Sequence, residues 1–132
     1  MAGKGKKPTF ASKKVKFLGP VADMQSLYVA ADLLVLPTVY DPFSNACLEA
    51  LSYGMPVITT ITNGFAEIIE PDVHGQVISR ADDVEALQEA IEKWIDRDRR
   101  ESARAGCAEL ARRFSIDRNL VETLRVLEHL RG

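Results

Sequence analysis

The chain has 132 residues, of which 46% are hydrophobic and 27% charged, and its net charge is −2 at pH 7. This length allows one domain, since independently stable domains usually run to about 100–150 residues. The composition excludes a disordered, collagen-like or disulfide-rich class. Two cysteines 60 positions apart exclude a CxxC motif and give no disulfide framework, which favours a reducing, cytoplasmic location. No apolar run approaches the roughly 18 residues that span a bilayer.

Charge is distributed unevenly along the chain. Residues 1–16 hold six lysines and no acid, so the rest of the chain carries 11 basic and 19 acidic side chains. The net negative charge of residues 17–132 argues against nucleic acid as a partner. We expect residues 1–14 to form a flexible, solvated basic segment; the alternative is that its lysines contact phosphate or an anionic membrane surface.

Short apolar runs alternate with helix-like segments over the first half of the chain. The patterns predict strands at 15–18, 33–36, 56–60 and 76–78, and helices or helical turns at 24–31, 44–53 and 65–69. Gly54 stands where the helix at 44–53 needs a C-terminal cap, and Asn63-Gly64 predicts a turn.

Three amphipathic helices follow residue 80, and Asp82 or Asp83 caps the first of them. Strands that alternate with helices, followed by helices alone, predict an α/β fold. We expect a Rossmann-like parallel sheet of about four strands with helices on both faces and a helical C-terminal segment.

The connection after the strand at 33–36 is the candidate ligand site, because open α/β sheets bind ligands at the carboxyl ends of their strands. Asp41 precedes the next helix, and Glu49 lies eight positions later inside it. Between them, the backbone N–H groups at the helix start form an anion site that the helix dipole strengthens; these belong to Ser44, Asn45 and Ala46.

A diphosphate at this helix start, with one carboxylate on each side, would match a nucleotide sugar. Asp41 would accept hydrogen bonds from the sugar's hydroxyls and Glu49 from the ribose diol. The alternative is that Asp41 and Ser44 only cap the helix and that Glu49 is a solvated helix residue.

The other reactive side chains are expected to be structural. Cys47 and Cys107 share apolar helix faces with leucines, which predicts burial. His74 has neither a carboxylate nor a second histidine at ligand spacing, so no metal site is expected. Trp94 is expected in the core, and His129 can complement a helix dipole.

One long segment, LLVLPTVYDPFSNACLEALSYGMPVITT, resembles the donor-binding core of the group 1, retaining GT-B glycosyltransferases. In that family an acidic residue and a glutamate, separated by seven residues, flank the helix that receives the nucleotide sugar. The resemblance continues through NGFAEIIEPDVHGQVI and back to VKFLGPV, so it covers residues 15–80, while 81–132 agree in pattern only. The form DPFSNACLEAL is most similar to members that build lipopolysaccharide cores or related surface glycans.

The resemblance implies roles for individual residues. Asp41 corresponds to the first acid, usually a glutamate, which contacts the donor sugar, and Glu49 to the acid that binds the ribose. Glu67 corresponds to an acid whose role is less uniform. The positions whose backbone faces the sugar and phosphates are Phe43, Ser44 and Asn45. The resemblance implies no cofactor and no metal beside the nucleotide sugar itself.

Members of this family have two Rossmann-like domains, and their basic residues that grip the diphosphate lie upstream of anything present here. The resemblance therefore implies that residues 15–132 are a partial C-terminal domain, with βα units at 15–80 and helices at 81–132. We expect the chain to lack the N-terminal acceptor domain and to be inactive alone. The parent enzyme would transfer a hexose or heptose to a surface glycan or lipid-linked acceptor at the inner face of the cell membrane.

Two other functions stay open at this point. One is a non-catalytic scaffold or interaction module that retains the fold, and the other is part of a GT-B sugar-nucleotide epimerase. The sequence also predicts an exposed sheet edge beside residues 33–36. This edge either pairs with residues 15–18 or is filled by a second copy in a homodimer.

Overall fold

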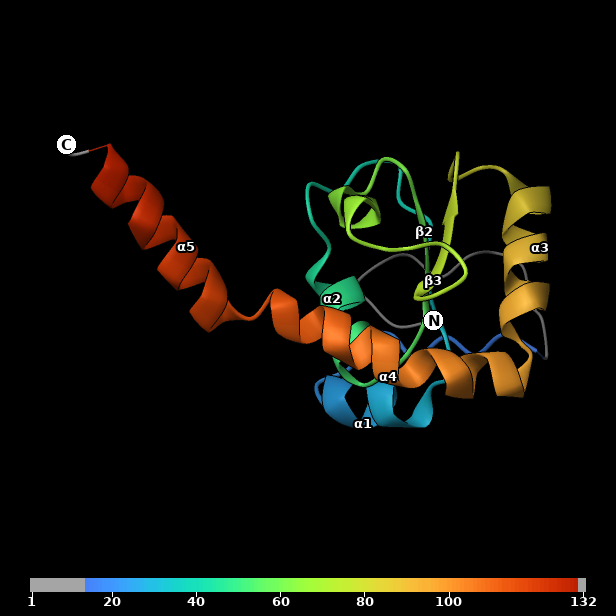
Figure 1. The fold of residues 1–132 in the computed structure, drawn as a ribbon. Helices are drawn as coiled ribbons and strands as arrows, with labels where there is room; N and C mark the ends of the chain where they lie inside the picture. Colours follow the sequence, from blue (N-terminus) through green and yellow to red (C-terminus); the bar gives the residue numbers. More distant parts are fainter. Residues whose placement is uncertain (1–13, 131–132) are drawn as a thin grey trace. The chain divides into compact units, whose positions relative to one another are not determined.

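The computed structural model describes residues 14–130, apart from the side chains of 116 and 117 (Figure 1). The chain divides into two units, residues 1–30 and 31–132. Of the predicted basic segment, residues 1–13 lie outside the described residues. In the described part of the first unit, the one helix is α1, Met24–Ala30. Asp23 caps it by accepting a hydrogen bond from the N–H of Ser26 at 3.0 Å. Hydrogen bonds from Ser26 lower the pKa of the Asp23 carboxyl.

Residues 15–18 do not form the predicted strand. A strand needs a hydrogen-bonded neighbour, and the three-stranded sheet of the described residues lies wholly within residues 31–132. In this sheet β1 pairs with β2, and the filling of its other edge by residues 15–18 or by a second copy stays a prediction.

The second unit is built on a parallel sheet with the strand order β1-β2-β3. The strands are β1, Leu34–Leu36, β2, Val57–Thr60, and β3, Gly75–Ile78. Every residue of the central strand β2 is buried, as expected for a parallel strand that is covered on both faces. The predicted α/β parallel fold is confirmed, and the described residues form three strands where about four are predicted.

Four α-helices and one 3₁₀ helix complete the described part of this unit: α2, Asn45–Ser52, η1, Gly64–Glu67, α3, Val84–Trp94, α4, Arg97–Arg113, and α5, Ile116–His129. Figure 1 shows α2 and α3 on opposite sides of the sheet, and α4 packs along α2. The helices therefore cover both faces of the sheet and leave its carboxyl edge to the loops.

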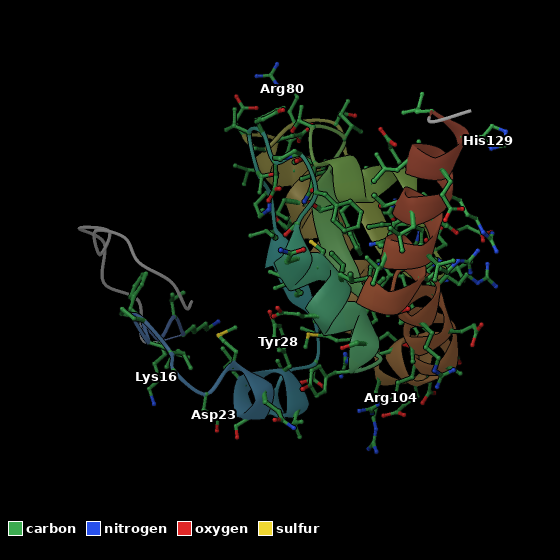
Figure 2. All side chains as sticks on the ribbon, turned by 90° about the vertical axis from the view of Figure 1, so that its left-hand side faces the viewer. Lys16, Asp23, Tyr28, Arg80, Arg104 and His129 are labelled. Atoms are coloured by element: carbon green, nitrogen blue, oxygen red, sulfur yellow. The ribbon has the colours of Figure 1, made fainter. Side chains whose placement is uncertain are left out.

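An aspartate caps the start of α3. The carboxylate of Asp83 accepts a hydrogen bond from the N–H of Ala86 at 2.9 Å, which confirms one of the two predicted caps. The other candidate, Asp82, instead pairs with the guanidinium of Arg80 at 2.7 Å, and Figure 2 shows Arg80 on the surface. That pairing holds the pKa of the Asp82 carboxyl below its usual value.

The predicted C-terminal cap of α2 is confirmed at Gly54. Its φ is +72°, a conformation that residues with a Cβ avoid, and its N–H donates to the carbonyl of Leu51 at 2.8 Å. A Cβ at this position would also lie 2.6 Å from Cγ of Arg104. Glycine therefore serves both the turn and the close packing of α4.

The core of the second unit contains Trp94 and both cysteines, as predicted. Burial raises the pKa of the Cys47 thiol to about 11 and that of Cys107 to about 12. Because the thiolate is the reactive form of cysteine, both residues are unreactive near neutral pH.

α5 is amphipathic, as predicted, but its leucines are exposed: Leu120, Leu124 and Leu127 expose 57%, 49% and 52% of their surface. Nowhere in residues 14–130 does a helix combine the length and apolarity needed to cross a bilayer.

His74 gives the fold a pH dependence that can be measured. Its Nδ1 accepts a hydrogen bond from the N–H of Glu70 at 3.2 Å, so the ring is held in its neutral form. Burial is the main cause that lowers the pKa of His74, and the charge of Arg113 lowers it further, while the charge of Glu70 acts in the opposite direction. The stability that this gives is fully present above the unfolded-state pKa of about 6.5 and is lost as the pH falls toward the lower folded-state pKa.

We therefore expect the free energy of unfolding to decrease between pH 7.5 and pH 5.5 more steeply in the parent protein than in His74→Asn, whose side-chain oxygen can accept the same hydrogen bond without titrating. Urea unfolding across this pH range measures both slopes. Equal slopes in the parent protein and in His74→Asn would show that His74 does not cause this pH dependence.

Candidate functional site

The loop between β1 and α2, residues 37–44, lies at the carboxyl edge of the sheet and is called the β1–α2 loop below. The segment that follows β2 holds it by its main chain. The N–H of Asp41 donates to the carbonyl of Thr62 at 3.3 Å, and the N–H of Gly64 donates to the carbonyl of Asp41 at 2.9 Å. These bonds form a short parallel bridge between Asp41 and Asn63, so the position of Asp41 depends on the neighbouring strand.

The side chain of Asp41 closes a local turn. One carboxylate oxygen accepts a hydrogen bond from the N–H of Phe43 at 3.1 Å, two residues on, which is the geometry of an Asx turn. Among residues 14–130, no ion pair engages Asp41, Glu49 or Glu67. Each of these carboxylates therefore keeps acceptor capacity for a ligand's hydroxyl groups.

The start of α2 carries amide groups that the fold does not use. Ser44 is the N-cap residue, but its side chain makes no capping hydrogen bond. The residue is buried, with 4% of its surface exposed. Within the described part of the chain, no hydrogen bond uses the N–H groups of Ser44, Asn45 or Ala46. The interpretation of Asp41 and Ser44 as simple side-chain caps of α2 is therefore wrong. The predicted cluster of amides at a helix start is present, with the partial positive charge of the helix dipole behind it.

Glu49 lies one turn into α2 and is exposed. It forms part of the wall of a pocket of about 340 Å³ between α2 and the end of α4. The pocket is lined by Leu48, Glu49, Ser52, Ala108, Ala111, Arg112, Phe114 and Ser115. Asp41 is not among these residues, so the two predicted acids do not share this pocket: Asp41 lies in the loop before α2, and Glu49 lies within the helix.

Phe43 ties the β1–α2 loop to the core. Its ring packs edge to face against Phe65, with 5.5 Å between ring centroids and 65° between ring planes, and it lies 6.5 Å from the ring of Phe114. Phe65 is completely buried. The resemblance implied a role for the backbone of Phe43, and the structure adds an anchoring role for its side chain.

Glu67 belongs to η1, the element that contacts the main chain of Asp41, and it is exposed. The side chain of Asn63 sets up η1: its Oδ1 accepts from the N–H of Phe65 at 3.0 Å, and its Nδ2 donates to Oγ1 of Thr59 at 2.9 Å. The third predicted acid therefore lies at the same edge of the sheet as the β1–α2 loop.

Sequence reasoning missed the groups that hold this loop. It interpreted Asn63-Gly64 only as a turn, whereas a Cβ on Gly64 would lie 2.0 Å from the carbonyl oxygen of Pro42. It also gave no role to Thr60 and Thr62, whose hydroxyls both bond the carbonyl of Thr38. The available signal was a set of hydroxyl residues at the end of a buried strand and just beyond it.

A metal site is not found among the described residues, since no group of three or more His, Cys, Asp or Glu side chains is arranged to hold an ion.

The chain is similar to known proteins over most of its length. Residues 1–97 match the family described as Glycosyl transferases group 1. The lipopolysaccharide core biosynthesis mannosyltransferase LpsB of Rhizobium meliloti is 31% identical over 121 residues, which cover 89% of this chain and 34% of LpsB.

Two solved structures share the fold. HepE of Anabaena, crystallised in complex with UDP, superposes with a TM-score of 0.71 at 27% identity and covers 84% of this chain and 32% of HepE. The C-terminal domain of the group 1 family protein LpcC of Francisella tularensis superposes with a TM-score of 0.63 at 24% identity, over 74% of this chain and 52% of that domain. This likeness to LpcC supports the fold alone.

The chain spans between 16% and 34% of the length of the first curated relatives that it matches. The family match covers well over half of the chain, and the fold agrees with it. The chain therefore belongs to the group 1 glycosyltransferases.

Proposed function

We propose that this chain supplies the nucleotide-sugar donor site of a retaining glycosyltransferase that transfers a hexose or heptose to a surface glycan or lipid-linked acceptor. The observation that carries the proposal is the unused set of amides at the start of α2, with Asp41 before it and Glu49 after it. HepE, a structural neighbour, binds UDP, and LpsB is a mannosyltransferase of lipopolysaccharide core biosynthesis. Both relatives support this substrate class.

The proposed contacts follow the order of groups in a nucleotide sugar. The diphosphate accepts hydrogen bonds from the amides of Ser44, Asn45 and Ala46, where the helix dipole favours negative charge. Asp41 accepts from the hydroxyls of the sugar, and Glu49 accepts from the ribose diol. Glu67 on η1 is proposed as a further acid beside the sugar.

Charge explains why we propose that the chain is inactive alone. A diphosphate brings negative charge next to the carboxylates of Asp41 and Glu49, and none of the proposed contact residues is basic. Cations that neutralise the leaving diphosphate in the transition state would supply much of the rate enhancement. We propose that residues outside this chain provide these cations, the acceptor site and the positioning of the two substrates.

Substitution of Glu49 by glutamine tests the ribose contact. The amide keeps one oxygen acceptor but loses the charge, and we expect the affinity for UDP to fall about tenfold, since hydrogen bonds to a charged group are worth roughly 1.5–3 kcal/mol. Glu49 is exposed, so the fold should be unaffected. The measurement is a titration of the chain with UDP at millimolar concentration, followed by nitrogen-15 NMR.

Glu128→Gln is the matched control, because Glu128 is also an exposed helical glutamate, on α5. It should bind UDP as the parent chain does. Equal affinities for all three proteins would remove Glu49 from the site, and no binding by the parent chain would argue for the scaffold function.

A further inference from the structure

We propose that the hydroxyls of Thr60 and Thr62 are positioning groups for the donor site: they fix the carbonyl of Thr38 and so hold Asp41 in place. The inference rests on the proposed function of the β1–α2 loop, because it assigns to these threonines the placement of a group that would bind the sugar.

Both hydroxyls converge on one oxygen atom. Oγ1 of Thr60 donates to the carbonyl oxygen of Thr38 at 2.6 Å, and Oγ1 of Thr62 donates to the same oxygen at 2.9 Å. A carbonyl oxygen has two lone pairs, and each hydroxyl has one hydrogen. The two hydroxyls also lie 3.1 Å from each other, and Oγ1 of Thr60 lies 3.4 Å from Oγ1 of Thr38. The three threonines therefore form one cluster of hydrogen bonds around the carbonyl of Thr38.

These bonds begin where the sheet's own hydrogen bonding ends. Leu36 is the last residue of β1 that pairs with β2, opposite Thr59. The next residue, Pro37, has no N–H to donate. Thr38 is therefore held by the two threonine side chains where the main-chain ladder no longer reaches.

The loop is consequently fastened at two points by the same segment of chain. The first is Thr38, through the hydroxyls, and the second is Asp41, through its main-chain bonds to Thr62 and Gly64. Between them, Val39 and Tyr40 are 82% and 78% exposed, so packing does little to hold that part of the loop. Loss of the first attachment leaves a longer free segment before Asp41, and ordering that segment costs conformational entropy whenever a ligand binds.

The substitutions that separate the hydroxyl from the methyl group are valine and serine. Thr60 is completely buried and Thr62 is exposed. Valine keeps the shape of threonine and removes the hydrogen bond, whereas serine keeps the hydroxyl and removes the methyl group. A positioning role predicts that valine is the harmful change at both sites, and a packing role predicts that serine is.

The experiment compares Thr60→Val, Thr60→Ser, Thr62→Val and Thr62→Ser in the full chain, with Thr123→Val on α5 as a surface control. Two readouts are taken: the hydrogen exchange of the Asp41 amide, and the affinity for UDP by NMR titration. We expect each valine variant to exchange about fivefold faster at Asp41 and to bind UDP about fivefold more weakly, as the loss of one hydrogen bond implies. The serine variants and the control should stay within about twofold of the parent chain.

The two readouts distinguish a failure of the proposed function from a failure of the positioning role. If the parent chain does not bind UDP, the proposed function fails, while the exchange at Asp41 still tests whether the hydroxyls hold the loop. If exchange is unchanged in the valine variants, or serine is the more harmful change, the positioning role is overturned. Faster exchange with unchanged affinity in a chain that binds UDP also overturns it. Should Thr60→Val fail to fold, the pair at the exposed Thr62 carries the same comparison.

Discussion

Substitution of Gly64 by alanine is expected to lower the free energy of unfolding by about 2–3 kcal/mol and to displace the β1–α2 loop. A Cβ at this position would lie 2.0 Å from the carbonyl oxygen of Pro42 and 3.0 Å from its carbon. Both atoms belong to the main chain, so no side-chain rotation can relieve the contact. The two segments must separate, and the hydrogen bond from the N–H of Gly64 to the carbonyl of Asp41 would be lost.

Gly106→Ala is the matched control for this substitution. Gly106 lies inside α4, and the nearest atom to a Cβ there would be Nε2 of His74 at 3.7 Å, which is an ordinary contact. Because alanine is favoured over glycine in a helix by up to about 1 kcal/mol, this variant should be neutral or stabilised. Urea unfolding gives both free energies. A Gly64→Ala variant as stable as Gly106→Ala would show that the loop can yield, against our account of the close approach.

Removal of the Phe65 side chain is expected to have the largest effect on stability. Phe65 is completely buried, and truncation of a buried phenylalanine to alanine costs about 3–5 kcal/mol. This is a large share of the roughly 5–15 kcal/mol that stabilises a typical domain. The variant Phe65→Ala should therefore unfold at much lower urea concentration than the parent chain.

The milder change Phe65→Leu is expected to leave the chain folded, and it tests whether the ring also anchors the β1–α2 loop. The ring of Phe43 meets Phe65 edge to face at 5.5 Å. A double-mutant cycle with Phe43→Ala should give a coupling free energy of about 1 kcal/mol. Additive effects of the two substitutions would mean that the ring contact contributes nothing to holding the loop.

Local patterns in the sequence predict most of the second unit. The β-branched run at residues 57–60 indicates a buried strand, Gly54 indicates the end of α2, and Asp83 indicates the start of α3. Each of these features depends on residues within a few positions of one another. The α/β order of elements, and with it the carboxyl edge of the sheet as a candidate site, follows from them.

The errors come from contacts between distant parts of the chain. Residues 15–18 have a strand-like composition, but a strand also needs a partner, and local pattern does not reveal one. Ser44 has the residue type of a helix cap, yet it is buried and makes no side-chain capping bond. The bonds from Thr60 and Thr62 to Thr38 join residues 22 and 24 positions apart. The support of the candidate site was therefore not predictable from spacing alone.

The central claim is that the start of α2 binds the diphosphate of a nucleotide sugar, and a comparison of UDP with uridine tests it most directly. Nitrogen-15 NMR spectra of the chain would be recorded during titration with each compound. We predict that UDP shifts the amide signals of Ser44, Asn45 and Ala46, and that uridine, which lacks the phosphates, leaves them unchanged. Identical shifts with both compounds, or shifts with UDP that spare these three amides, would contradict the claim.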